Sequence, residues 1–187
     1  MNLMMKETLT AARQTKVATT PADILFYDVA DCALGKVLIA RGAKGVCAIL
    51  LGDDAEELAE ELASRFPQAM LIASEAWVER DLAKVSRYIE RPSDGLHLKL
   101  EMRGTPFQRR VWEKMKAIPV GRTVSYMELA RWISPLANPR AVASACGANP
   151  IALAVPCHRV VRSNGDLGGY RWGSERKDQL IQKEAMA

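Results

Sequence analysis

The apolar residues change their spacing along the chain, and this change constrains the fold more than any other feature. Short apolar runs come first, at Ile24 to Val29, Lys36 to Arg41 and Gly45 to Leu51, with glycines at the turns between them. Runs of this length that end at glycine are typical of β-strands. The pattern therefore predicts a three-stranded antiparallel sheet near the start of the chain.

Helical spacing follows this sheet. The segment from Asp53 to Phe66 repeats its apolar residues at helical intervals and has acidic residues in its first turn, and the segment from Glu75 to Glu90 has the same period. Such spacing buries one face of a helix, and acidic side chains stabilise the positive end of the helix dipole. A turn with proline and glycine at residues 91–95 ends the second helix. We therefore expect an α/β N-terminal domain over residues 21–96.

The second half of the chain contains helices with well-marked starts. Thr105 to Gln108 and Ser125 to Glu128 each combine a hydroxyl N-cap with a Gln or Glu three residues later. Asn138-Pro139 opens a third helix, and Ser174 is expected to cap the last one. The pattern predicts a mainly α C-terminal domain over residues 97–187.

Two of these helices, Ser125 to Ile133 and Pro139 to Cys146, are short and close together, which predicts a helix-turn-helix, although most short helix pairs serve only for packing. The second helix carries Arg140, Ala141 and Ser144, so one long cationic side chain stands among small residues. A helix that reads the major groove normally carries several long polar side chains. The composition favours docking into the minor groove of DNA, and the alternative is a helix packed tightly against its neighbours.

Length and hydropathy narrow the class of protein. The chain has 187 residues, which is enough for two small domains. No apolar run approaches the roughly 20 residues that span a bilayer, so we expect no membrane partner. Residues 1–20 lack the continuous apolar core of a signal peptide, so we expect a flexible leader and a cytoplasmic protein.

The cysteines favour free thiols over a metal site or a disulfide framework. None of the four stands in a CxxC pair, and the chain has only two histidines; the residues are Cys32, Cys47, Cys146, Cys157, His97 and His158. Structural zinc sites need more closely spaced ligands, and disulfide frameworks belong to small secreted domains. The sequence therefore predicts no metal.

Charge is distributed unevenly between the two halves. Residues 1–96 hold 11 Lys/Arg and 15 Asp/Glu, a net charge of −4, whereas residues 97–187 hold 15 Lys/Arg and 7 Asp/Glu, a net charge of +8. A basic half of this kind is typical of proteins that bind a polyanion, because each neutralised phosphate releases counterions. The alternative is a solvated surface that is merely unevenly charged.

The run Pro156-Cys157-His158-Arg159-Val160 places a thiol beside an imidazole in the basic half. A thiol reacts as its thiolate, so it needs a lowered pKa or a base, and histidine is the commonest base. Cys157 is a candidate nucleophile, with His158 acting through a bridging water, and the alternative is a buried, unreactive thiol. The acid that would orient His158 is left open among Glu101, Glu113, Glu128, Asp166, Glu175, Asp178 and Glu184.

The same residues resemble a known family. Asn149-Pro150, Pro156 to Val160 and Gly169-Tyr170 are similar to the active-site loop of the methylated-DNA–protein-cysteine methyltransferases, also called O6-alkylguanine-DNA alkyltransferases. The resemblance is dense from about Gly104 to Glu184. It implies a ribonuclease-H-like N-terminal lobe. It also implies irreversible, stoichiometric transfer of the methyl group of O6-methylguanine, and of O4-methylthymine, to a cysteine, with no cofactor.

The resemblance also implies catalytic roles for individual residues. Cys157 would accept the methyl group, His158 would be its base through a water, and Glu184 would orient His158. Asn149 would join the DNA-binding helix to the active-site loop, and Tyr126 would donate a hydrogen bond to the guanine.

Further residues are implied to bind the substrate, which is double-stranded DNA with its alkylated guanine flipped out, bound by a monomer. Arg140 would fill the gap in the duplex, with Ala141 and Ser144 on the same helix. The main-chain carbonyls of Cys157 and Val160 would accept from the exocyclic amine of the base. The pocket would be lined by Tyr170 and Arg171, and the bulk of Arg171 and Trp172 implies a preference for small alkyl groups.

Two other functions use some of the same features. A lesion sensor would flip and bind an alkylated base without transfer, but such relatives lack the acceptor cysteine that this chain has. A cysteine hydrolase would use a thiol and an imidazole, but these usually come from distant segments.

Overall fold

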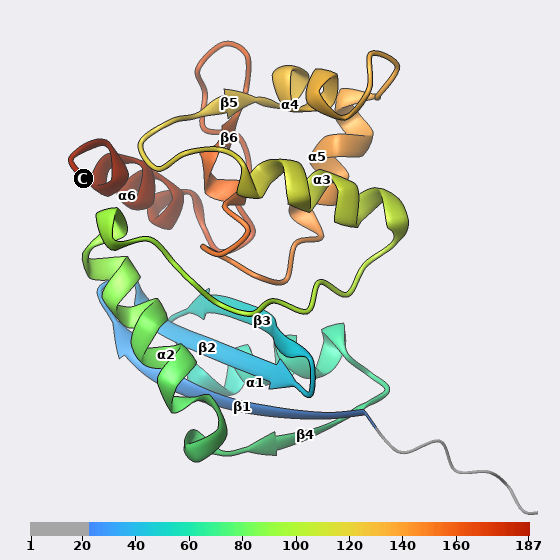
Figure 1. Ribbon diagram of the computed structural model, residues 1–187. Coiled ribbons are helices and arrows are strands. Elements are labelled where there is room, and N and C mark those ends of the chain that lie inside the picture. The colour runs from blue at the N-terminus through green and yellow to red at the C-terminus, as the bar shows by residue number, and fades with distance from the viewer. Residues whose placement is uncertain (1–22) are drawn as a thin grey trace, which may run out of the picture.

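The computed structural model describes residues 23–187. Its N-terminal half is built on a mixed four-stranded sheet with the order β3-β2-β1-β4 (Figure 1). The strands β1 (Asp23–Cys32), β2 (Gly35–Gly42) and β3 (Gly45–Gly52) form antiparallel pairs, which confirms the three predicted strands. The expected leader, residues 1–20, lies outside the described residues.

The prediction that the sheet has three antiparallel strands is wrong, because a fourth strand joins it. This strand, β4 (Ala69–Ala73), pairs in parallel with β1. Its five residues form one of the two edges of the sheet, opposite β3, and pair there with β1. Periodicity cannot separate so short an apolar run from a loop.

The two helices of the N-terminal half cover opposite faces of the sheet. α1 (Ala55–Arg65) is capped by Asp54, whose carboxylate accepts from two backbone amides. It packs Leu58 against Gly52 of β3. α2 (Glu75–Glu90) lies on the other face, where Trp77 stacks on Phe26 of β1 at a ring distance of 4.4 Å. Side chains alternate between faces along a strand, and the register puts Gly52 and Phe26 on opposite ones.

Three helices pack together in the C-terminal half, namely α3 (Pro106–Lys116), α4 (Tyr126–Ile133) and α5 (Pro139–Gly147). Both predicted capping boxes are present, at Thr105 and at Ser125. The indole of the buried Trp112 in α3 donates to the carbonyl of Ala145 in α5 at 2.8 Å, which fixes the two helices against each other.

Short elements complete this half. The 3-10 turns are η1 (Pro92–Asp94) and η2 (Cys157–Arg159), and the strands β5 (Val124–Ser125) and β6 (Val160–Val161) form one parallel pair. The last helix is α6 (Ser174–Ala185). The prediction that Ser174 caps this helix is wrong by one residue, because Gly173 occupies the N-cap with a φ of 99°.

The two halves are joined at the edge strand β3. Val46 exchanges backbone hydrogen bonds with Lys99 and Glu101, at 2.8 Å each. Farther along the strand, Ile49 donates to Pro150 and accepts from Ala152, at 2.9 Å each. These contacts satisfy backbone groups that an edge strand would otherwise leave unpaired, and they anchor the segment that leads to Cys157.

No helix among residues 23–187 is long and apolar enough to cross a membrane.

A substitution at Gly45 tests the junction between β3 and the C-terminal half. This glycine has a φ of 151°, and a β-carbon at this position would collide with the backbone carbonyl of Lys99. Because neither backbone can yield easily, we expect Gly45→Ala to lower the free energy of unfolding by at least about 3 kcal/mol, as measured by urea denaturation. Gly165→Ala is the matched control: its φ is 86°, but a β-carbon there meets no described atom within 4 Å, so the expected cost is about 1 kcal/mol. Equal costs for the two variants would contradict this account of the junction.

Candidate active site

The side chain of Asn149 fixes the loop that carries Cys157. Its Oδ1 accepts from the amide of Ile151 at 2.9 Å, and its Nδ2 donates to the carbonyl of Val155 at 2.8 Å. The same Nδ2 lies 3.4 Å from the sulfur of Cys157. Asn149 is 1% exposed and follows directly after α5, so it connects the end of that helix with the loop. Leu153, with a φ of 67°, makes the turn inside the loop.

Cys157 is the first residue of η2, and its thiol is protonated at neutral pH. Burial raises the pKa of Cys157 above its ordinary value of 9.0, and the hydrogen bond from Asn149 and the charge of Lys177 oppose this shift without cancelling it. The sequence left open whether a lowered pKa or a neighbouring base activates this thiol, and the raised pKa excludes the first. A reaction at this sulfur needs a base.

His158 is a fully buried imidazole with a carboxylate on one side. Its Nε2 lies 2.7 Å from Oε1 of Glu184, which resolves the acid that the sequence left open. Burial would raise the pKa of Glu184, but hydrogen bonds from His158 and Arg159 lower it to about 2. Since Glu184 is ionised, Nε2 carries the proton that faces it.

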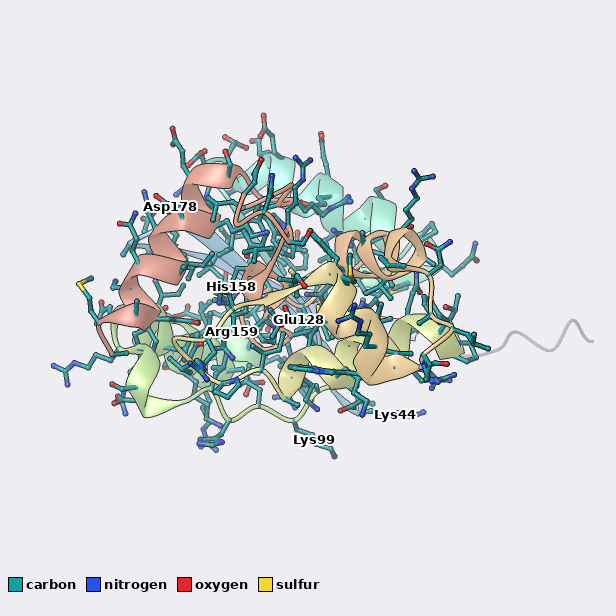
Figure 2. The ribbon with its side chains drawn as sticks, turned by 90° about the horizontal axis from the view of Figure 1, so that it is seen from above. Lys44, Lys99, Glu128, His158, Arg159 and Asp178 are labelled. Carbon is teal, nitrogen blue, oxygen red and sulfur yellow. The ribbon has the colours of Figure 1, made fainter. Side chains whose placement is uncertain are left out.

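The other ring nitrogen of His158 is therefore an acceptor. Nδ1 is buried and has no hydrogen-bond partner among residues 23–187. Burial lowers the pKa of His158, although Glu184 works in the opposite direction, so the ring is neutral at pH 7. A neutral imidazole with a free, buried acceptor nitrogen is able to take a proton. Figure 2 shows His158 and Arg159 at the centre of the molecule, with Lys44 and Lys99 at its periphery.

Glu184 also accepts hydrogen bonds from two side chains to which the sequence analysis gave no role, Arg159 and Tyr88. Arg159 donates through Nε to Oε2 at 2.8 Å and through Nη2 to Oε1 at 2.9 Å, and its Nη1 donates to the carbonyl of Ile118. The hydroxyl of Tyr88, from α2, donates to Oε1 at 2.9 Å and accepts from Nη2 of Arg159 at 2.7 Å. Arg159 belongs to the loop Pro156 to Val160, but nothing in the sequence pattern points to Tyr88.

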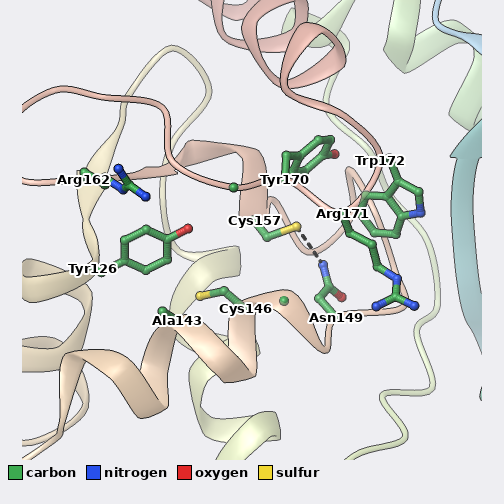
Figure 3. Close-up of a pocket in the computed structure, with 11 residues that line it drawn as sticks. Tyr126, Ala143, Cys146, Asn149, Cys157, Arg162, Tyr170, Arg171 and Trp172 are labelled. Atoms are coloured by element: carbon green, nitrogen blue, oxygen red, sulfur yellow. Dashed lines mark hydrogen bonds between the residues drawn. The ribbon is translucent and has the colours of Figure 1, made fainter.

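Cys157 borders a cavity of about 580 Å³ between α5 and the segment after β6 (Figure 3). This volume is typical of a pocket for a small molecule. The predicted residues that line it are Cys157, Asn149, Tyr126, Tyr170 and Arg171, and the others are Ala143, Cys146, Gly147, Arg162, Gly169 and Trp172. Figure 3 shows the hydroxyl of Tyr126 directed into the cavity.

Both tyrosines of the cavity are protonated at neutral pH. Burial raises the pKa of Tyr126 to about 12, and it raises the pKa of Tyr170 as well. The Tyr170 ring packs edge-on against Trp172 at 5.3 Å. The pocket therefore offers the hydroxyl donor of Tyr126 beside apolar aromatic surface, which suits a flat, polar, aromatic ligand.

A buried lysine, Lys177, supports the wall of the cavity and was not predicted. Its ammonium donates to the carbonyls of Val160 at 2.6 Å, of Gly169 at 3.4 Å, and of Leu167. It precedes Glu184 by two helical turns on α6, so both residues face the core. That spacing was the one signal in the sequence that could have identified it.

The remaining predicted residues lie outside the cavity. Arg140, Ala141 and Ser144 are exposed on one face of α5, and Gly147 continues this face to the cavity. Val160 is buried, and its carbonyl accepts from Lys177. The structure therefore places the residues around Cys157 inside the protein, and Arg140, Ala141 and Ser144 of α5 on its surface.

Arg171 is tied to the N-terminal half. Its Nε donates to Oε1 of Glu61 at 2.8 Å, and Glu61 also pairs with Arg65 of the same helix, α1. Arg171 thus borders the cavity while its guanidinium is held from the other half of the chain. Among residues 23–187, no group of three or more His, Cys, Asp or Glu residues is placed to hold a metal ion.

Comparison with known proteins places this geometry in a family. The sequence pattern of a family described as "6-O-methylguanine DNA methyltransferase, DNA binding domain" matches residues 106–186. The chain is 46% identical over 159 residues to the "Bifunctional transcriptional activator/DNA repair enzyme Ada" of Escherichia coli, which aligns 85% of this chain with 45% of that protein. The chain therefore spans less than half the length of that relative.

Two other relatives match over nearly their full length. The "Methylated-DNA--protein-cysteine methyltransferase" of Candida albicans is 36% identical over 172 residues, which cover 87% of this chain and 97% of that protein. The crystal structure of Mycobacterium tuberculosis OGT in complex with DNA superimposes with a TM-score of 0.72 at 30% identity, covering 86% of this chain and 93% of that one. The chain therefore belongs to the family of methylated-DNA–protein-cysteine methyltransferases.

Proposed function

We propose that this protein repairs alkylated DNA directly, by irreversible transfer of the methyl group of O6-methylguanine, and of O4-methylthymine, to Cys157. The observation that carries the proposal is the arrangement of Cys157, His158 and Glu184. A protonated thiol borders a pocket for a nucleobase, and beside it a neutral imidazole is oriented by a carboxylate and keeps a free acceptor nitrogen. Family membership and the names of the relatives support the same reaction.

The transfer proceeds as a proton removal followed by a substitution. The thiol proton of Cys157 moves through one water to Nδ1 of His158, and Glu184 stabilises the imidazolium. The thiolate attacks the methyl carbon in line with the bond to O6. A sulfur–carbon bond forms, the carbon–oxygen bond breaks, and its electron pair stays on the purine, which takes up a proton. No group in the pocket reverses the thioether, so each molecule acts once.

Tyr126 and Tyr170 receive the base. Because burial raises the pKa of Tyr126, its phenol stays protonated and is able to donate to the guanine while negative charge develops on the purine, and Tyr170 lines the pocket. The bulk of Arg171 and Trp172 at the pocket favours small alkyl groups.

DNA binds through its minor groove to the exposed face of α5, with the alkylated base flipped into the pocket. Ala141, Ser144 and Gly147 allow close approach, and Arg140 occupies the space that the base leaves. Flipping costs a few kcal/mol, and the net charge of +8 on residues 97–187 helps to offset it. The complex with DNA reported for the Mycobacterium tuberculosis relative supports this partner.

Further parts of the proposal concern the whole protein. The sheet half and the helical half act as two domains, residues 21–96 and 97–187, of which the first is ribonuclease-H-like. The pair α4 and α5 is a helix-turn-helix. The protein works in the cytoplasm as a monomer, without a cofactor.

Removal of the acceptor sulfur tests the reaction most directly. After incubation with duplex DNA that contains O6-methylguanine, we expect the intact mass of the protein to increase by one methyl group in place of one hydrogen. Cys157→Ala should show no increase, because the nucleophile is gone. Cys146→Ala, which removes the other thiol of the same pocket, should still gain the methyl group. Binding of the DNA without any mass gain in the unaltered protein would instead indicate a lesion sensor.

The pH dependence tests the base. In His158→Ala the thiolate can form only by ionisation to solvent, and burial keeps the pKa of Cys157 above 9.0. We expect the rate of methyl transfer at pH 7 to fall at least about 100-fold and then to rise about tenfold per pH unit up to pH 9. The unaltered protein should show no such rise above neutral pH. A small loss in the variant, or a rate independent of pH, would exclude His158 as the base.

A further inference from the structure

We infer that Tyr88 is a positioning residue of the transfer reaction, which shares one oxygen of Glu184 with His158 and thereby limits how strongly His158 holds the proton taken from Cys157. This inference rests on the proposed function. It assigns a part in the reaction to α2, a helix of the N-terminal half that does not border the acceptor pocket.

The contacts of Tyr88 carry the inference. Its side chain is 2% exposed, and its hydroxyl reaches Oε1 of Glu184 at 2.9 Å across a separation of 96 residues. Oε1 is also the oxygen that faces Nε2 of His158, at 2.7 Å. Burial raises the pKa of Tyr88, so the phenol remains a hydrogen-bond donor at any pH at which the protein works.

Three donors therefore share one carboxylate oxygen, while among residues 23–187 Oε2 accepts only from Nε of Arg159. Each hydrogen bond to an anion withdraws part of its charge, so every additional donor weakens the others. The contact with Tyr88 thus reduces the stabilisation that Glu184 gives to a protonated His158. Loss of the hydroxyl should make His158 a stronger base.

The carboxylate should keep its place without this hydroxyl. Arg159 holds both oxygens of Glu184 and is itself anchored at the carbonyl of Ile118. The titratable groups around the pair are Tyr88 from α2, Cys157 and Arg159 from η2, Tyr170 after β6, and Lys177 from α6. Of these, only Tyr88 changes in the substitution below, so a shift in the titration of His158 reports on its hydroxyl.

Tyr88→Phe in the full chain tests the inference by proton NMR of the histidine rings. The chain has only two histidines, so the ring signals of His158 are readily assigned. We expect the midpoint of His158 to rise by about half a pH unit. Tyr27→Phe is the matched control, because the Tyr27 hydroxyl makes no hydrogen bond within residues 23–187 and its loss should leave the His158 curve in place. An unchanged or lowered midpoint of His158 would overturn the inference.

The rate of methyl transfer gives a second readout. In Tyr88→Phe the acid side of the pH–rate profile should move upward by the same half unit, with a plateau rate that is equal or higher, because a stronger base forms more thiolate. A lower plateau with an unmoved acid side would mean that Tyr88 has only a structural role. Absence of methyl transfer in the unaltered protein would contradict the proposed function, whereas the NMR titration would still decide the role of Tyr88.

Discussion

The site depends on the hydrogen bonds that the buried carboxylate of Glu184 accepts. A carboxylate that is removed from water is costly unless hydrogen bonds and opposite charge replace its hydration. Here Tyr88, His158 and Arg159 supply them, from a helix of the N-terminal half and from the loop, while Glu184 itself comes from the last helix. Because His158 Nε2, the Tyr88 hydroxyl and Arg159 Nε would each lose their acceptor without the carboxylate, the three segments favour being buried together. The buried charge of Glu184 must be hydrogen-bonded, and this requirement fixes the position of the His158 imidazole.

Burial then moves the thiol and the imidazole in opposite directions. It raises the pKa of Cys157 and lowers that of His158, so the neutral pair is the resting state. A thiolate is the form that reacts with oxidants and with stray electrophiles, and a thiol is far less reactive. For the proposed reaction, which consumes the cysteine, a protonated resting state protects the sulfur until it is used. In the proposed reaction the sulfur becomes nucleophilic only when His158 takes its proton.

Local signals in the sequence predicted the elements that local chemistry determines. The three strands at glycine turns, the capping boxes at Thr105 and Ser125, and the Cys157–His158 pair all depend on neighbours within a few positions. The strand β4, the donor Tyr88 and the buried Lys177 depend instead on partners far away in the sequence. No periodicity records such a partner. The acid for His158 illustrates the limit, because residue patterns left seven candidates and only a resemblance selected Glu184.

The active-site loop is held from both of its ends, and this explains why the two halves form one working unit. At its start, Ile49 of the sheet binds the backbone of Pro150 and Ala152. At its end, Glu184 binds the side chains of His158 and Arg159. Between these anchors Leu153 adopts a positive φ of 67°, a conformation that a residue with a branched side chain adopts only when its surroundings enforce it. The position of the sulfur therefore follows from the sheet edge as much as from the helices. A change that loosens β3 should disturb the acceptor even though no strand of the sheet borders its pocket.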